Sequence, residues 1–303
     1  MKVIYLFVIV FIITASEKAY TQGCSDAGFC TINSLKANAL NGKDSAKSNQ
    51  LSFGISTGQA DHRVTIFGSH LSYKKQLSKN FGFDLKLTYL SQSSSLTNSA
   101  GLSDVYISTQ YNASKNAQFT AGVKLPLNDG NKKLDGFSLP MDFQNSLGTT
   151  DLILGFSTAI EKIQFTAAIQ QPLTQNKNAF LSSNYPVSSA FRQYQSTNMY
   201  DRKGDILLRI SYPLIEVQKI KVTPSLLPIY HISNDEYTDL LGIRKEINGS
   251  QGLTLNGNVF VEYAINKTNK IELSVGAPFV VRDARPDGLT RSFVLGLDYK
   301  FFF

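Results

Sequence analysis

The sequence has no apolar run long enough to cross a membrane as a helix. Its first apolar stretch, Val3 to Ala15, is shorter than the roughly 18 residues that a span needs, and no later segment approaches that length. This excludes a helical inner-membrane protein. Tryptophan is absent, yet the chain has 14 Tyr and 20 Phe among many Ser, Thr, Asn and Gln residues. That balance fits a β-sheet with one apolar face and one face in contact with water.

Clustered positive charge is also missing. The net charge is +7, but the Lys and Arg residues are scattered among carboxylates and form no basic stripe, so we do not expect a nucleic-acid partner. The chain contains no Gly-rich phosphate-binding loop and no cofactor motif, and we predict no cofactor.

Cysteine and histidine are scarce. Only Cys24 and Cys30 are present, and in an oxidising compartment they are expected to form a local disulfide. A metal site built on them would need His62, His70 or His231, all distant in sequence, so no metal is predicted. The same three histidines lie on different predicted strands or loops, and no Ser has a nucleophile motif around it. We therefore predict that the protein is not an enzyme.

The N-terminus is typical of a secretory signal peptide. Met1 and Lys2 supply a charged start, the apolar run follows, and polar sequence comes next, so we assign residues 1–22 to a cleaved leader. Cleavage is expected between Ala19 and Gly23. A lipoprotein with Cys24 as the lipidated residue is the alternative, although Tyr20 to Gly23 lacks the usual small apolar residue three positions before the cysteine.

From Gln50 onward, apolar residues recur at every second position over runs of about 9 to 13 residues. In the run from Phe81 to Tyr89, the apolar residues alternate with Gly82, Asp84, Lys86 and Thr88, and the two sets face opposite ways in a strand. The same pattern predicts twelve strands, near 50–58, 64–77, 81–91, 102–113, 117–126, 150–160, 163–172, 204–214, 220–232, 252–265, 270–279 and 290–303.

The predicted connections alternate between tight and long. Ser78 to Asn80 and Glu161 to Lys162 are tight, whereas 92–101, 127–148, 173–203 and 233–250 are long and rich in Asn, Ser, Asp and Gly. Short periplasmic turns and long outer loops are typical of an outer-membrane barrel. We therefore predict an all-β, transmembrane, antiparallel up-and-down barrel over residues 49–303, in the outer membrane of a Gram-negative bacterium, with both termini in the periplasm.

A soluble β-sandwich is the competing fold, because alternation alone also describes its strands. A sandwich core would not accept the Asp, Lys, Arg and Glu residues of the second face without pairing them. The chain also ends in alternating apolar residues with a terminal aromatic, which resembles the signal by which the barrel-assembly machinery recognises its substrates. That candidate assembly signal is Leu295, Leu297, Tyr299, Phe301 and Phe303.

A hairpin-level repeat carries a family resemblance. Three strands begin alike at Gly101-Leu-Ser-Asp, Gly148-Thr-Thr-Asp and Gly204-Asp, and several others end in proline, as at Val123-Lys-Leu-Pro. Together with the aromatic end, these pieces make residues 100 to 303 resemble the outer-membrane transporter family of the meta-pathway of phenol degradation, distantly like long-chain fatty-acid transporters. The resemblance implies passive uptake of small compounds, including hydrophobic or aromatic ones.

Alternation places a set of polar residues in the lumen under the outer mouth. They form either a constriction that biases passage by charge or a hydrogen-bonded band that stiffens the wall. The candidates are Asp104, Lys124, Asp151, Gln170 and Asp205, with Arg209 lower in the lumen. The tyrosines at 89, 111, 212, 230, 263 and 299 are predicted to face lipid as interfacial girdles.

Residues 23–48 precede the first strand and lack alternation. In the fatty-acid transporters, the corresponding region folds into the barrel, so this segment, with Phe29 on the expected disulfide loop, either plugs the lumen or stays in the periplasm.

The sequence leaves two functions open as alternatives. The first is a channel or transporter for a small solute. The second is a structural or docking barrel that binds a protein through loops 173–203 and 233–250.

Overall fold

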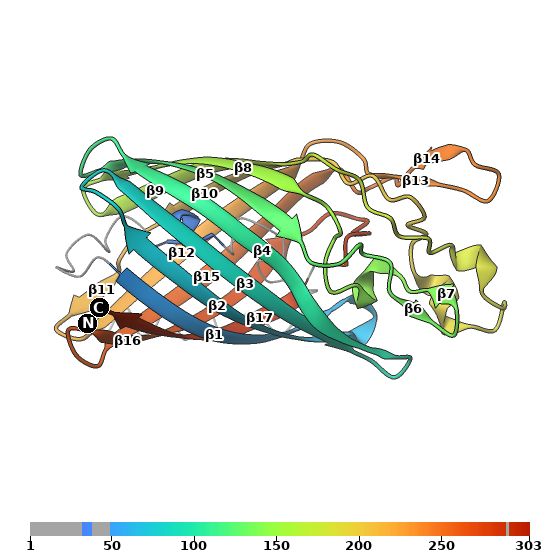
Figure 1. The fold of residues 1–303 in the computed structure, drawn as a ribbon, viewed down its shortest axis with the longest axis horizontal. Coiled ribbons are helices and arrows are strands. Elements are labelled where there is room, and N and C mark those ends of the chain that lie inside the picture. The colour runs from blue at the N-terminus through green and yellow to red at the C-terminus, as the bar shows by residue number, and fades with distance from the viewer. Residues whose placement is uncertain (1–31, 38–48, 289–290) are drawn as a thin grey trace.

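The computed structural model describes residues 32–37, 49–288 and 291–303. It is a closed, antiparallel, twelve-stranded β-barrel, as predicted (Figure 1). The twelve strands are β1 (Asn49–Ala60), β2 (Thr65–Gln76), β3 (Phe81–Ser93), β4 (Asn98–Asn112), β5 (Ala117–Pro126), β8 (Asp151–Ile160), β9 (Ile163–Pro172), β10 (Asp205–Ser211), β12 (Ile220–His231), β15 (Gly252–Ala264), β16 (Asn269–Val280) and β17 (Arg291–Phe302).

Pairing between the first and last strands closes the barrel. β1 pairs with β2 on one side and with β17 on the other, and β10 pairs with both β9 and β12, so the ring of strands has no free edge. A closed barrel satisfies every backbone hydrogen bond between strands, which is the condition for crossing a bilayer without a helix.

The two faces of each strand are chemically different. On β10, Asp205, Leu207 and Arg209 are buried toward the lumen, while Ile206 and Leu208 between them are exposed on the outer surface. Most exposed large apolar residues of the barrel wall follow this outward pattern. Such a surface requires lipid, because a monomer in water rarely exposes continuous apolar area of this extent. Within the described part of the chain, no helix is both long and apolar enough to span a membrane.

The connections also alternate as predicted, with one difference at the predicted loop 92–101. β3 continues to Ser93 and β4 begins at Asn98, so this pair of strands extends beyond the rest of the wall. The extension has a local cause, because Asn145 from a long loop hydrogen-bonds Gln92 and Ser99 and buries both.

A second difference concerns the predicted strand 204–214, which is interrupted. A short β11 (Ile215–Val217) resumes the pairing with β12 after Pro213, which has no N–H to donate.

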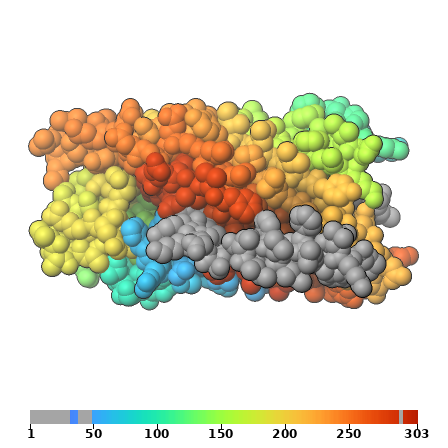
Figure 2. Space-filling model, turned by 180° about the vertical axis from the view of Figure 1, so that it is seen from behind, coloured from blue at the N-terminus to red at the C-terminus, as the bar shows by residue number. Residues whose placement is uncertain are grey.

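The long connections fold into a cap at one end of the barrel (Figures 1 and 2). The cap contains η4 (Asp61–Arg63), β6 (Lys133–Leu134), β7 (Phe137–Ser138), η5 (Met141–Phe143), η6 (Ser182–Asn184), η7 (Ala190–Gln193), β13 (Glu236–Thr238) and β14 (Arg244–Glu246). It has its own apolar core, in which Phe143, Phe180, Phe191 and Tyr194 pack together. We call these loops the cap. At the opposite end, the backbones of Asn49 and Phe303 bond each other.

Candidate functional site

Residues 32–37, which include the short turn η2 (Asn33–Leu35), lie inside the barrel against its wall. Six of their contacts reach five of the strands. These are Asn33 to Asp84 on β3 (2.8 Å), Ser34 to Thr120 on β5 (3.0 Å), the Leu35 carbonyl to Arg209 on β10 (2.7 Å), the Lys36 carbonyl to Gln164 on β9 (3.2 Å), the Lys36 ammonium to Asp298 on β17 (3.7 Å) and the Ala37 carbonyl to Ser211 on β10 (3.0 Å). We call residues 32–37 the inner segment.

Apolar packing adds to these bonds. Ile32 and Leu35 are buried in a cluster within the lumen, against inward-facing side chains of β4, β8, β9, β10 and β12. The wall residues of the cluster are Tyr106, Ile153, Ala168, Leu207, Leu227 and Ile229. Full burial of a Leu or Ile side chain contributes roughly 1.5–3 kcal/mol. On this side of the lumen, the inner segment is therefore held by apolar contacts in addition to its polar ones.

The candidate residues Lys124, Asp151 and Gln170 form one buried polar group near the cap. The Lys124 ammonium lies 2.9 Å from Asp151 Oδ2, and the side-chain amide of Gln170 donates to the same oxygen. Thr149 of the loop before β8 accepts from Lys124 at 3.0 Å and donates to Asp151 at 2.6 Å. All four side chains are almost fully buried, so in this state they join the wall to the loop.

Asp104 occupies an irregular point in the wall. The register of β3 against β4 shifts between Leu87 and Tyr89, which turns both Ser103 and Asp104 toward the interior. The Asp104 carboxylate accepts from Ser103 at 2.8 Å and from Ser146 at 2.6 Å. Ser146 belongs to the loop before β8, so Asp104 helps to hold this loop across the mouth of the barrel.

Asp205 belongs to a buried ionic network that sequence reasoning missed. His231 bridges two carboxylates, with Nδ1 2.6 Å from Asp205 and Nε2 2.8 Å from Asp235. Carboxylates only accept hydrogen bonds, so both ring nitrogens donate and the imidazole carries a positive charge. The further members are Arg202 on Asp205 (2.5 Å), Arg282 on Asp287 (3.1 Å) and the Tyr200 hydroxyl on Asp235 (2.8 Å). The network ties three loops of the cap to β10 and β12.

The sequence holds one signal for part of this network and none for the rest. Asp205 and His231 stand at the ends of predicted strands, and the register pairs them directly across the β10–β12 seam. Arg202, Asp235 and Asp287 lie in long loops, where no periodicity fixes direction. The remaining candidate, Arg209, lies farther down β10 and binds the inner segment.

The cap buries a second carboxyl group of interest. Asp142 in η5 is half-buried beside the aromatic core of the cap. Burial, followed by the nearby charge of Asp61, raises the pKa of the Asp142 carboxyl from 3.8 to about 7. Arg285, which forms a 2.8 Å ion pair with Asp61, moderates that shift. The carboxyl of Asp142 therefore titrates near neutral pH.

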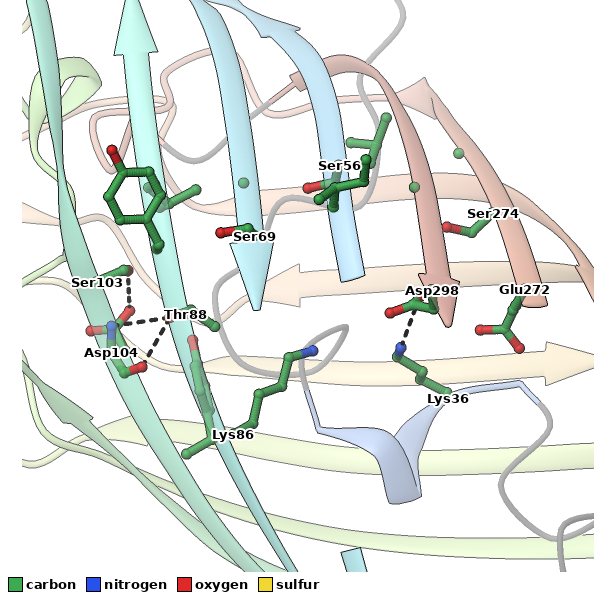
Figure 3. A pocket seen from close by; sticks show the side chains of 18 of the residues that line it. Lys36, Ser56, Ser69, Lys86, Thr88, Ser103, Asp104, Glu272, Ser274 and Asp298 are labelled. Carbon is green, nitrogen blue, oxygen red and sulfur yellow. Dashed lines mark hydrogen bonds and ion pairs between the residues drawn. The ribbon is translucent and has the colours of Figure 1, made fainter. Parts of the chain in front are cut away.

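A cavity of about 210 Å³ remains between the inner segment and the loop that crosses the mouth (Figure 3). Thr88, Ser103 and Asp104 lie on one side of it, and Ser56 and Ser274 on another, with Lys36 and Lys86 reaching between them. Asn145, Ser146 and Leu147 line it on the loop side. Among the described residues, no group of three or more His, Cys, Asp or Glu side chains is arranged to hold a metal ion.

The remaining predicted site residues divide into two sets. Leu295, Leu297, Tyr299 and Phe301 all point outward from β17, as the alternation predicted, and the exposed Phe303 ends the chain beside Asn49. Five of the six predicted girdle tyrosines are exposed on the outer surface, and Tyr89 is half-buried. Cys24, Cys30 and Phe29, together with the predicted signal peptide, lie outside the described residues.

No protein-family model matches the sequence, and no curated protein matches it. Solved structures resemble it at low identity. They include the KdgM porin (9% identity, TM-score 0.44, 84% of this chain and 99% of that chain), the translocator domain of the autotransporter NalP from Neisseria meningitidis (10%, 0.46, 88% and 91%) and the P. putida toluene transporter TodX (11%, 0.42, 88% and 92%). At these scores the likenesses carry no argument about the function of this chain.

Proposed function

We propose that the protein is an outer-membrane channel for passive uptake of a small solute, held closed by its own N-terminal inner segment. One observation carries the proposal: residues 32–37 sit within the lumen and contact strands on several sides of it. A barrel needed only as an anchor has no reason to keep a polar interior, because apolar packing would stabilise it equally well. A barrel with a polar lumen and an internal segment that can leave it could regulate the passage of a solute through the position of that segment.

The closed state has two barriers in series. The inner segment lies within the lumen, and the loop containing Asn145 and Ser146 lies across the mouth, held by Asp104, Gln92 and Ser99. A solute must displace both or pass beside them. The band formed by Lys124, Asp151 and Gln170 holds the loop in this state and would line the mouth once the loop moves.

The orientation in the membrane follows the ordinary pattern of bacterial barrels. The cap lies outside the cell, the tight turns and both termini lie in the periplasm, and the outward face of β17 serves as the assembly signal. The resemblance of residues 100–303 to phenol-pathway transporters makes hydrophobic or aromatic compounds one candidate class of solute.

A docking barrel is the second candidate function, and one feature favours it. The hairpin of β13 and β14 projects away from the barrel, and its tip exposes Leu240 and Leu241. Residues 233–250 are thus presented for contact with another protein. A docking barrel would remain closed to solutes when its inner segment is removed.

Deletion separates the two functions. A variant lacking residues 24–48, with the signal peptide retained, is compared with the full-length protein in planar bilayers after both are shown to be heat-modifiable on gels. The channel proposal predicts larger and more frequent conductance steps in the variant, because its lumen has lost the inner segment. No conductance through either folded protein would contradict the channel proposal and favour docking, whereas equal conductance through both would contradict closure by the inner segment. A variant with Lys115 and Asn116 exchanged, in an exposed turn at the opposite end from the cap, controls for general perturbation.

A further inference from the structure

The cavity beside the inner segment exists because one wall of the barrel is built from small residues. Ser56 of β1, Gly68 of β2, Ser274 and Gly276 of β16 and Gly296 of β17 all line it. The inner segment packs instead against the larger apolar residues of the opposite wall, such as Leu207 and Leu227. The lumen is thus filled on one side and hollow on the other. The hollow is larger than the roughly 150 Å³ that holds a benzene molecule, so it accommodates a six-membered ring with substituents.

The charged groups around the cavity cancel. Among the described residues, three cations and three anions line it, and each anion contacts a hydroxyl or cationic group of the protein. The anion contacts are Asp104 with Ser103 and Ser146, Glu272 with Lys300, and Asp298 with Lys36 and His70. The three cations are Lys36, Lys86 and Arg209. A charged solute would add an uncompensated charge to this balanced site, which is costly in a buried environment. The lining therefore favours a neutral solute.

The neutral part of the lining combines hydrogen-bonding groups with aromatic rings. Ser56, Ser274 and Asn258 contribute hydroxyl and amide groups, while Tyr106 and Phe260 contribute rings that are buried toward the lumen. Asn258 is only 8% exposed, and its Oδ1 atom accepts no hydrogen bond from the described residues. A buried acceptor of this kind carries a desolvation penalty that a donor on a ligand would remove.

The position of Asn258 depends on its neighbour. Gly276 is paired with Asn258 across β15 and β16, and a side chain at Gly276 would collide with the Asn258 amide. The absence of a side chain at 276 thus leaves room for that amide at the edge of the cavity. The unpartnered acceptor and the cavity that it borders are two separate observations that point to the same occupant.

We propose that this cavity binds a neutral, polyhydroxylated ring of monosaccharide size, with a ring hydroxyl donating to Asn258 Oδ1. Further hydroxyls exchange hydrogen bonds with Ser56 and Ser274, and the C–H faces of the ring pack on Tyr106 and Phe260. The proposal rests on the channel function, since the site lies within the lumen that a solute would cross. It narrows that function to a solute class.

The test compares three probes of equal size with different charge. Glucose, glucuronate and protonated glucosamine are offered to liposomes that contain the full-length protein, and permeation is followed by swelling. We expect glucose to enter faster than both charged analogues and to show saturation. Equal rates for the three probes, in liposomes that conduct small ions, would overturn the neutral site and leave the channel intact. Impermeability to all probes and to ions, both in the full-length protein and in the folded variant that lacks residues 24–48, would instead overturn the channel function itself.

A matched pair of variants locates the site. Asn258→Leu removes the unpartnered acceptor, whereas Asn256→Leu changes a buried asparagine two residues away on the same strand that does not line the cavity. We expect glucose entry to fall several-fold, up to about tenfold, in the first variant only, which is the effect of one lost hydrogen bond. Equal loss in the two folded variants would overturn the assignment of Asn258.

Calorimetry on the unmodified protein in detergent provides a test that needs no variant. Binding of glucose, with no binding of glucuronate, is the expected result. Binding of benzyl alcohol without glucose would overturn the polyhydroxylated class and assign the cavity to an aromatic alcohol. The absence of a binding heat with every neutral ring compound tested would overturn the proposal that the cavity is a binding site.

Discussion

The guanidinium of Arg209 donates a 2.7 Å hydrogen bond to the backbone carbonyl of Leu35, although the two residues are 174 positions apart in the chain. This bond ties the barrel wall to the inner segment. Hydrogen bonds from charged donors contribute roughly 1.5–3 kcal/mol, so a single contact of this kind shifts an open–closed equilibrium by about tenfold or more. The wall therefore controls the position of the segment through a small number of contacts.

Substitution of Arg209 should loosen the closed state. Arg209→Met keeps much of the side-chain volume and removes the donor, so we expect channel openings to become about tenfold more frequent in planar bilayers. The control is Ser225→Ala, a buried, lumen-facing change on neighbouring β12 at a hydroxyl with no hydrogen-bond partner among the described residues. Opening frequencies that are equal in the two variants would contradict a closing role for the Arg209 contact.

The cap should loosen as the pH rises through neutrality. The pKa of Asp142 in the folded cap is raised to about 7, above its ordinary value of 3.8, so the folded state holds a proton that the unfolded loop has released. The penalty for ionising the buried carboxyl therefore grows as the pH rises from about 4 and is complete above about 7. We expect proteases to cut loops 127–148 and 173–203 faster at pH 8 than at pH 6.

Asp142→Asn removes this titration. The variant should show the same cleavage rate at the two pH values, after correction for the protease itself, whereas Asp135→Asn at an exposed loop position should behave like the unmodified protein. A pH dependence that survives in the Asp142 variant would assign the effect to other groups.

The network around His231 should hold the cap on the barrel. His231→Leu leaves Asp205 and Asp235 without their shared donor, and breaking a buried ionic group in this way costs about 3–5 kcal/mol. We expect rapid proteolysis within 233–250 while the barrel stays heat-modifiable, because the strands pair independently of the cap. Lys245→Gln on the exposed hairpin is the comparison, and resistance of loop 233–250 in both variants would contradict the role of His231.

The outward residues at the chain end should direct assembly. Tyr299→Ser combined with Phe303→Ser should reduce folded protein in the outer membrane, because the change removes apolar surface from the lipid face and from the terminal signal together. Phe119→Ser with Phe156→Ser removes an equally exposed aromatic pair from internal strands. A similar loss in both double variants would mean that lipid-facing area alone matters.

The sequence predicted the barrel well because a barrel strand has a strict period of two residues. All twelve predicted strands are present, and the alternation on β10 and β17 correctly separates lumen from lipid. Where neighbours in the chain are both apolar, as at Leu207 and Leu208 or Leu226 and Leu227, the apolar pattern alone gives no direction, and only flanking polar residues such as Asp205 and Arg209 indicate it. In the structure, Leu207 and Leu227 point inward and bury the inner segment. These doubled apolar positions were a signal that something apolar occupies the lumen.

The candidate site was predictable only in part. Placement of Asp104, Lys124, Asp151, Gln170, Asp205 and Arg209 inside the barrel follows from strand alternation and from the repeated strand starts. Their partners were not predictable, because Ser146, Thr149 and Arg202 come from long loops whose path depends on tertiary packing. The register shift at Asp104 was not predictable either, since an extra residue in one strand reverses the alternation locally.

The most direct test of the closed channel is to lock the inner segment in place. Ser34 Oγ and Thr120 Oγ1 lie 3.0 Å apart, so cysteines at these two positions, with Cys24 and Cys30 replaced by serine, are close enough for a disulfide. Single-channel conductance is recorded under oxidising conditions and again after a reductant is added. The account predicts a barrel that stays closed while oxidised and conducts after reduction, with no change in either single-cysteine variant. Full conductance through the oxidised, cross-linked barrel would contradict it.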